Sequence, residues 1–247
     1  MSFQFTRITS IEPPILSKSY TLEDGQLTKA VSAQLTRGIA TRRRIERFSA
    51  FVSELKTLQT SEALTFGIAS HDVAQIITKR AYEKLPESQK DLFLTRSNAH
   101  FVWPEGPAIM MFDIDPPSHG AALSRESVLK LFEEVCPMLR EVPKIWFPSS
   151  SSHICCRETG EDLTGLRGQR LYMPVARGTE IPEIAEAIWT RLWAEGHGFI
   201  QISKSGMRRK STPIDRTVYQ PSRLDFAAGA ATGPGLFQKR GKPEYLA

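Results

Sequence analysis

The chain has few cysteines and no long apolar run, and each absence excludes a class of protein. Its three cysteines are Cys136 and the adjacent Cys155 and Cys156, so no repeated C-x-x-C set exists, and none of the five histidines completes one. We therefore expect reduced thiols and predict no zinc. The sequence contains neither a stretch of about 18 apolar residues nor the basic start and apolar core of a secretion signal. We expect a soluble, cytoplasmic protein with no membrane partner.

Acidic residues are scarce in one segment only. The whole chain has 32 Lys and Arg against 27 Asp and Glu, a net charge of +5. Between residues 201 and 242, nine Lys or Arg stand against two Asp, a net charge of +7, so the rest of the chain carries −2. The basic character therefore belongs to the C-terminal part. It favours a polyanionic partner such as nucleic acid, although a solvated basic surface would have the same composition.

Apolar spacing and turn residues predict helices and strands that alternate irregularly, so we expect an α/β fold of the α+β type with a mixed sheet. Residues 1–26 are polar and turn-rich, and we expect an irregular lead-in there with a short strand at most. The predicted helices cover 41–58, with Arg42, Arg43 and Arg44 at its start, 72–84, 124–136, with Ser124 as N-cap, and 182–195, which Gly196 ends. The predicted strands cover 65–69, 109–115, 144–147, 169–175, 199–202 and 212–218.

The most informative stretch is the apolar run 108–112, which ends in two carboxylates separated by one residue. Strand side chains alternate between faces, so Asp113 and Asp115 are expected to point the same way, about 7 Å apart. Two acids so close repel each other unless a cation lies between them. Mg²⁺ and Mn²⁺ prefer carboxylate oxygens and complete their coordination with water and phosphates. The pair indicates a metal site for phosphoryl or nucleotidyl chemistry; the alternative is a strand that ends in an Asp-Pro turn.

Three segments in a fixed order carry a resemblance to a known family. The first is FDID (112–115), the second is Ser151-Ser152-His153, and the third is IDRTVYQPSRLDFAAGA (214–230), which contains Asp215 and Arg223. In this order they resemble the motifs of the archaeo-eukaryotic primase superfamily, the catalytic module of replicative primases and of plasmid and phage primase-polymerases. The resemblance covers roughly residues 100–230.

The second motif departs from the family pattern. In the family the histidine lies on a strand that continues beneath the nucleotide, whereas here residues 155–160 turn away soon after His153. The strand over 168–173 fits that description and carries Arg170 in the corresponding place. We therefore hold His153 and Arg170 as equal candidates for the residue that faces the triphosphate.

The resemblance implies a catalytic site and a fold. Asp113, Asp115 and Asp215 would be the catalytic residues and would bind two Mg²⁺ or Mn²⁺ ions. Asp225 is an alternative third ligand, but we favour a pairing with Arg223 for it. The implied fold is an RRM-like catalytic module with flanking helices. We expect one domain over 1–247, with a helical and α/β part over 1–100, the catalytic module over 101–235, and a tail or linker to a further domain over 236–247.

The implied activity is template-dependent nucleotide transfer, as in a DNA primase or DNA polymerase of plasmid, phage or mobile-element replication. The partners would be a single-stranded DNA template, nucleoside triphosphates and a helicase domain or subunit. The expected nucleotide-binding residues are Ser151, His153, Arg170, Lys204, Arg209, Lys210 and Arg223. The expected template contacts are Arg42, Arg43, Arg44, Lys239 and Arg240.

Two other functions remain open at this stage. A DNA-binding replication initiator with a non-catalytic primase-like domain would bind template without metal-dependent incorporation. A two-metal nuclease would use the same acids, but the sequence offers no clear general base near the D-x-D, and the second and third motifs would then be coincidence.

Overall fold

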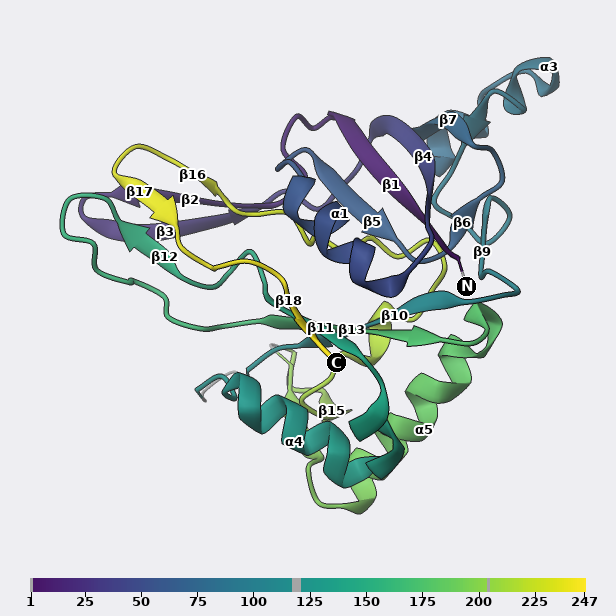
Figure 1. Ribbon diagram of the computed structural model, residues 1–247. Helices are drawn as coiled ribbons and strands as arrows, with labels where there is room; N and C mark the ends of the chain where they lie inside the picture. Colours follow the sequence, from purple (N-terminus) through teal and green to yellow (C-terminus); the bar gives the residue numbers. More distant parts are fainter. Residues whose placement is uncertain (1, 117–120, 204) are drawn as a thin grey trace.

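Two β-sheets lie on either side of helix α1 (Phe51–Thr57) in the computed structural model, which describes residues 2–116, 121–203 and 205–247 (Figure 1). The N-terminal sheet has the strand order β5-β1-β4-β7-β8, and its pairs are antiparallel except β7 with β8. Phe3 and Phe5 of β1 pack toward α1, whereas Ile8 lies in an apolar cluster on the opposite face. The strands are β1 (Phe3–Glu12), β4 (Arg37–Ile45), β5 (Glu62–Thr65), β7 (Val73–Ile77) and β8 (Phe93–Leu94).

Several predictions for the N-terminal part are wrong. Residues 1–26, expected to be irregular, contain β1 and β2 (Lys18–Glu23), and the expected helices over 41–58 and 72–84 begin as β4 and β7. The helical remainder is short: η1 (Phe48–Ala50), α1 and α2 (Lys79–Tyr82). Because β4 is paired on both edges, by β1 and by β7, interstrand hydrogen bonds outweigh the helical spacing of its apolar residues. Arg42, Arg43 and Arg44 therefore project from a strand.

The second sheet is antiparallel throughout, with the order β10-β13-β11-β18. Ile109 and Met111 of β10 face α1, while Met110 and Phe112 face two helices on the opposite side, α4 and α5. This period-two alternation follows from the pleat and explains why the whole run is apolar. The elements are β10 (Ala108–Ile114), β11 (Lys144–Pro148), β13 (Gln169–Val175), β18 (Glu244–Leu246), α4 (Arg125–Val135) and α5 (Ile181–Ala194).

The elements predicted for this part of the chain are confirmed within a residue or two. The Ser124 side chain accepts a hydrogen bond from the Ser127 backbone N–H and caps α4. Gly196 ends α5 with a φ of +82°, a conformation that a residue with a Cβ adopts at a cost. In the described part of the chain, no helix is long and apolar enough to cross a membrane.

The C-terminal segment runs back across the molecule and pairs with strands from other parts of the chain. Residues 236–247, expected to be a tail or linker, contain β17 (Leu236–Gln238), which pairs with β12 (Ile154–Cys156), and β18, which pairs with β11. Upstream, β16 (Ala231–Thr232) joins β2 and β3 (Gln26–Val31). Strands β2, β3, β12, β16 and β17 form an arm that extends from the two sheets (Figure 1), and Tyr20, Ile154 and Leu236 are buried in it.

Short elements connect the layers. The predicted strand over 199–202 is β14, which pairs with β15 (Arg208–Ser211), but the predicted strand over 212–218 is reduced to a single bridge at Ile214 followed by η4 (Arg216–Val218). The predicted strand over 65–69 is divided between the end of β5 and β6. The remaining elements are β6 (Ile68–Ala69), β9 (Phe101–Val102), α3 (Glu87–Lys90), η2 (Pro137–Glu141) and η3 (Gly178–Glu180).

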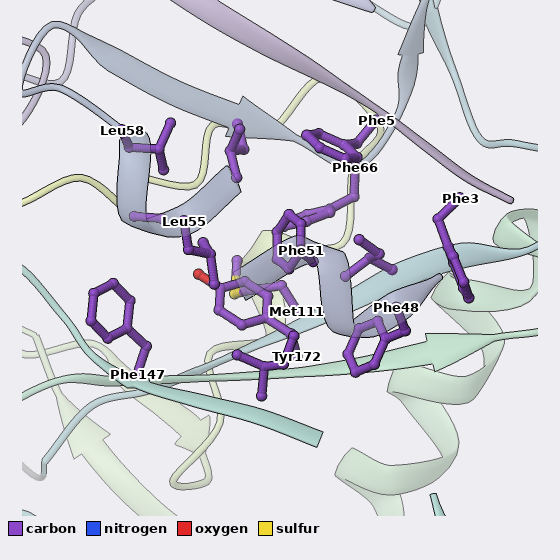
Figure 2. Close-up of a cluster of buried hydrophobic side chains, with 14 of the residues drawn as sticks. Phe3, Phe5, Phe48, Phe51, Leu55, Leu58, Phe66, Met111, Phe147 and Tyr172 are labelled. Carbon is purple, nitrogen blue, oxygen red and sulfur yellow. The ribbon is translucent and has the colours of Figure 1, made fainter. Parts of the chain in front are cut away.

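Aromatic side chains fill the space between the two sheets. Figure 2 shows Phe51 of α1 with Phe5 and Phe66 on one side and Tyr172 of β13 on the other. The Phe51 ring centroid lies 5.3 Å from that of Phe5 and 5.2 Å from that of Tyr172, both in edge-on geometry. Phe51 therefore joins the two sheets.

Phe51→Ala should lower the free energy of unfolding by about 3–5 kcal/mol, because it removes a fully buried ring from between two sheets. Leu92→Ala is the control, since that side chain is 65% exposed and its loss should change stability by less than about 0.5 kcal/mol. Urea unfolding measures both. Equal losses in the two variants would contradict the assignment of Phe51 to the core.

Candidate functional site

The three predicted catalytic acids lie at one edge of the second sheet. Asp113 is in β10, Asp115 follows its end, and Asp215 comes about a hundred residues later. The Asp215 backbone N–H donates a 2.9 Å hydrogen bond to the Asp113 carbonyl, and Ile214 bridges to Ile114 in antiparallel sense. The segment before η4 therefore runs along the free edge of β10, which brings the first and third motifs together.

A buried ion-pair network holds Asp113. Arg170 lies directly opposite it in the β10–β13 register, and its Nη1 contacts Asp113 Oδ1. The Arg170 Nε donates to Asp225 Oδ1 at 2.9 Å, and the Tyr172 hydroxyl donates to Asp225 Oδ2 at 2.8 Å. Arg170 is only 7% exposed and Asp225 1%. Each buried charge in this network thus has a hydrogen-bonded partner of opposite sign.

This network corrects two sequence-based interpretations. Arg170 was one candidate for the residue that faces the triphosphate. Its guanidinium instead forms ion pairs with Asp113 and Asp225, and so it positions the Asp113 carboxylate. Asp225 is a structural partner, as favoured, but of Arg170 and Tyr172 and not of Arg223. The physical reason is that the segment carrying Asp225 bridges to Leu64 of β5, which directs its side chain into the interior and away from the exposed Arg223.

Burial, together with neighbouring carboxylates, raises the pKa of Asp113 to about 7. Burial is the largest cause, and the charges of Asp115, Asp225 and Asp215 add to it, while Arg170 acts in the opposite sense. Burial alone would lower the pKa of Arg170, but Asp113 and Asp225 hold it above the ordinary value. Arg170 therefore stays charged, and Asp113 is the carboxyl group whose ionisation is unfavourable.

A pocket of about 420 Å³ opens beside these acids. Asp115 and Asp215 line it together with the predicted phosphate-binding residues Arg209 and Lys210 of β15. Cationic and carboxylate side chains that line one pocket suit a ligand that carries both phosphates and a metal ion. Arg209 and Lys210 thus share a pocket with two of the acids, and their role in nucleotide binding stays a prediction; Lys204 lies outside the described residues.

An aromatic wall of this pocket was missed from the sequence. Trp189 of α5 lines it, and the Arg216 guanidinium carbon lies 4.6 Å from the centre of the Trp189 ring. Arg216 also forms a 2.9 Å ion pair with Glu186. Spacing along α5 indicates only that Trp189 is an aromatic residue of a helix, because its approach to the acids depends on how α5 crosses the sheet.

The serine loop, residues 149–152, lies near Asp115, with Gly168 between them. All four residues from Ser149 to Ser152 are buried, and the Ser149 N–H donates to the Gly168 carbonyl at 2.8 Å. A Cβ on Gly168 would lie 2.6 Å from Asp115 Oδ1 and 2.8 Å from Ser149 Oγ, so any other residue there would displace these side chains. Ser149 is therefore the loop residue beside the acid. The predicted Ser151 lies behind it, with its Oγ 2.8 Å from that of Ser149.

Other predicted contact residues are engaged elsewhere. His153, with a φ of +56°, bonds Asp162 through Nδ1 at 2.6 Å, and no described contact joins it to the acids. The Arg240 guanidinium donates to two backbone carbonyls and lies 4.0 Å from the Phe147 ring centre, so it stabilises the interior and does not present itself to a template. The Arg223 and Lys239 residues are exposed.

The three arginines of β4 each have an acidic neighbour. Arg42 pairs with Asp72 at 3.2 Å, Arg43 with Glu54 at 2.8 Å and Arg44 with Glu46 at 3.3 Å. The Arg44–Glu46 pair is exposed and so is Asp72, the partner of Arg42, so these two pairs are weak, whereas Glu54, the partner of Arg43, is only 13% exposed. The role of the three arginines as template contacts stays a prediction.

Lys18 is a further basic residue near the acids that the sequence did not indicate. It comes from β2 in the arm, far from the motifs along the chain. Burial and the charge of Arg170 lower its pKa to about 8, with Lys29 acting in the same sense, while Asp115 and Asp113 raise it. No local pattern could have found it, because it is brought here by the pairing of β2 with the C-terminal β16.

The donor chemistry fits Mg²⁺ or Mn²⁺, but the carboxylates are not gathered around one point. Among the described residues, no three His, Cys, Asp or Glu side chains form a group that could hold a metal ion. Arg170 engages Asp113, and Asp215 accepts hydrogen bonds from the Thr217 N–H and hydroxyl at 2.8 and 3.0 Å. Asp115 has no such protein partner among the described contacts. The acids lie in one neighbourhood, and two of them would have to exchange protein partners for an ion.

Comparisons with known proteins add no family. A scan against protein-family models, a search of curated proteins and a search of solved structures each return no match. Function must therefore be inferred from the site and its motifs.

Arg170→Met should lower the free energy of unfolding by about 3–5 kcal/mol, because it leaves two buried carboxylates without their cation. Adding Asp225→Asn should recover part of that loss. Arg216→Met is the control, since its ion pair with Glu186 is exposed and should contribute at most about 1 kcal/mol. If denaturant unfolding gives similar values for Arg170→Met and Arg216→Met, Arg170 does not organise the site.

Asp113→Asn should stabilise the metal-free protein most at high pH. The folded-state pKa of about 7 exceeds the ordinary value of 3.8, so the wild type loses stability as pH rises between these values. In EDTA, the variant should gain at least about 2–4 °C in Tm at about pH 8, equivalent to about 1 kcal/mol, and less at about pH 5. Asp91→Asn, at an exposed position, is the control. A gain that does not grow with pH would contradict the raised pKa.

Proposed function

We propose that the chain is a template-dependent nucleotidyltransferase, a DNA primase or primase-polymerase that joins nucleotides on single-stranded DNA. The single observation that carries the proposal is the 2.9 Å hydrogen bond from the Asp215 backbone to Asp113. It joins the h-D-h-D motif to a third motif about a hundred residues further along, and both line up as the primase resemblance requires. A coincidental match would have no reason to bring those two acids to neighbouring backbone positions.

The connectivity of the second sheet supports the proposal. Its elements follow as β10, α4, β11, β13 and α5, and the segment at Ile214 then lies along the free edge of β10. The spatial order β10-β13-β11, with both helices packed on one face, is that of a β-α-β-β-α-β module. RRM domains have a four-stranded sheet of this kind. The inserted β12 and the hairpin β14–β15 are additions to it.

The pocket supports a division of roles. Asp113, Asp115 and Asp215 would hold two Mg²⁺ or Mn²⁺ ions, which supply charge neutralisation at the reacting phosphate and activation of the attacking hydroxyl. Arg209 and Lys210 would bind the triphosphate from the opposite wall. Arg170 of the neighbouring strand β13 holds the Asp113 carboxylate by an ion pair, and Gly168 leaves little space beside Asp115. Trp189 offers an aromatic surface for a base.

The proposed template path and partners rest on charge. The exposed arginines of β4 and the exposed Lys239 would contact the phosphate backbone, and a helicase domain or subunit would supply the single strand. Binding should therefore weaken steeply as salt rises.

The activity is tested by incubating the full chain with a single-stranded template, labelled nucleotides and Mg²⁺ or Mn²⁺, with and without a primer. We expect metal-dependent incorporation that falls by at least about 100-fold in Asp115→Asn and in Asp215→Asn, because each would remove a charged carboxylate ligand of the ions that act on the reacting phosphate. Asp91→Asn, at an exposed position, should retain full activity.

Three other outcomes would contradict the proposal. Template binding without incorporation in the wild type favours the replication initiator. Metal-dependent cleavage of the strand favours the nuclease. Full activity in Asp115→Asn or Asp215→Asn removes that acid from the site.

A further inference from the structure

Two tryptophans one helical turn apart lie on a partly exposed flank of α5. Trp189 and Trp193 have ring centroids 6.0 Å apart. Both are only partly buried. The buried residues of the helix, which face the second sheet, are Ile181, Ala185, Ile188 and Leu192. Aromatic side chains that remain partly exposed are typical of surfaces that bind a ligand or a partner.

The two rings differ in what covers them. Trp193 is covered by its own chain, because a Cβ on Gly198 would lie 2.3 Å from the nearest atom of the ring. Lys210 Nζ lies 5.7 Å from the centre of the same ring. Trp189 is covered by a mobile kind of group, the guanidinium of Arg216, whose Cζ lies 4.6 Å from the ring centre. Trp189 is therefore the ring that a side-chain movement alone can uncover.

The pocket beside the acids joins the Trp189 ring to three cations. Its lining includes Trp189, Arg209, Lys210 and Arg216, and its volume of about 420 Å³ lies within the range of about 300–1,000 Å³ that is typical of small-molecule sites. Residues 196–214, which contribute much of this lining, include four Lys or Arg and no Asp or Glu. An aromatic ring and cationic groups in one pocket match the two parts of a nucleotide, its base and its phosphates.

The Arg216 guanidinium lies where a base would stack, and it is held there weakly. Its other contact is a 2.9 Å ion pair with Glu186, and the two side chains are 56% and 50% exposed. An exposed cation–aromatic contact changes an equilibrium by only about 2–5-fold, and an exposed ion pair by at most about 5-fold. A stacked base contributes about 5–100-fold to affinity. A base can therefore displace the guanidinium, which is then free to pair with a phosphate.

We propose that Trp189 is the stacking surface for the base of a bound nucleotide, and that Arg216 covers this ring in the free protein and moves to the phosphates when the nucleotide binds. The inference rests on the proposed function in one respect, since it takes this pocket as the nucleotide site. It needs no metal ion, because stacking holds the base and the cations hold the phosphates. Stacking is tolerant of sequence, so the pocket should accept all four bases.

The test measures affinity by isothermal titration calorimetry in EDTA with three ligands: dATP, deoxyadenosine, which has no phosphate, and inorganic triphosphate, which has no base. In Trp189→Leu we expect the affinity for dATP to fall by about 5–100-fold while that for inorganic triphosphate is unchanged. Arg216→Gln should change the other two affinities in opposite directions. Deoxyadenosine should bind about 2–5-fold more tightly because the ring is uncovered, and dATP more weakly because a phosphate partner is lost.

Two control variants separate this role from a general effect on α5 or on charge. Trp193→Leu removes the neighbouring ring, which the chain already covers, and should leave the affinity for dATP unchanged. Arg177→Gln removes one positive charge at a position 64% exposed, where the arginine pairs with Glu180 and does not line the pocket. It should change none of the three affinities.

The possible failures are distinguishable. Equal losses of dATP affinity in Trp189→Leu and Trp193→Leu would overturn the inference, because a disturbance of α5 would explain both. A deoxyadenosine affinity that fails to rise in Arg216→Gln would also overturn it, since Arg216 would then not cover the ring. If the wild type binds no dATP in EDTA but incorporates nucleotides with Mn²⁺, the inference is wrong and the proposed function stands. If the expected affinities are found without any incorporation, the proposed function alone is wrong, and a chain that neither binds nor incorporates overturns both.

Discussion

The buried guanidinium of Arg170 is the interaction on which the rest of the site depends. It lies between Asp113 of β10 and Asp225 of the returning C-terminal segment, and so it connects the second sheet to the segment that bridges to Leu64 in the first. A buried charge of this kind costs free energy unless every partner is present. The network therefore makes the position of Asp113 depend on both sheets and on the return of the chain between them.

The same network sets the electrostatic state of the acid cluster. Arg170 neutralises one of its two carboxylate partners only in part, so the ionisation of Asp113 stays costly in the metal-free protein, with a pKa of about 7. A divalent cation would relieve that cost and would have to compete with Arg170 for the carboxylate. Asp115 is exposed and has no ion pair among the described residues. The ion pair that stabilises the metal-free protein would thus compete with the binding of a metal ion at Asp113.

Local patterns predicted those parts whose structure is determined locally. The run before Asp113, the Ser124 cap and the end at Gly196 were predictable because burial on both faces, capping and a positive φ each leave a mark on nearby residues. The structure of residues 41–58 was not predictable in this way. Their apolar residues are spaced as in one helix, but the first of them belong to a strand that is paired on both edges and the rest to short helices. The Arg170–Asp225 pair was equally hidden, since it arises from strand register and from a segment that returns from elsewhere in the chain.

In the proposed site, Asp113, Asp115 and Asp215 would together hold the divalent ions while Arg170 remains bound to Asp225. Anomalous diffraction at the manganese edge, from crystals grown with Mn²⁺ and a non-hydrolysable nucleoside triphosphate, tests it most directly. The account predicts an anomalous peak within about 2.2–2.4 Å of carboxylate oxygens from both Asp113 and Asp215, with the triphosphate against Arg209 and Lys210. A peak bound elsewhere, or a nucleotide bound with no metal at these acids, would contradict it.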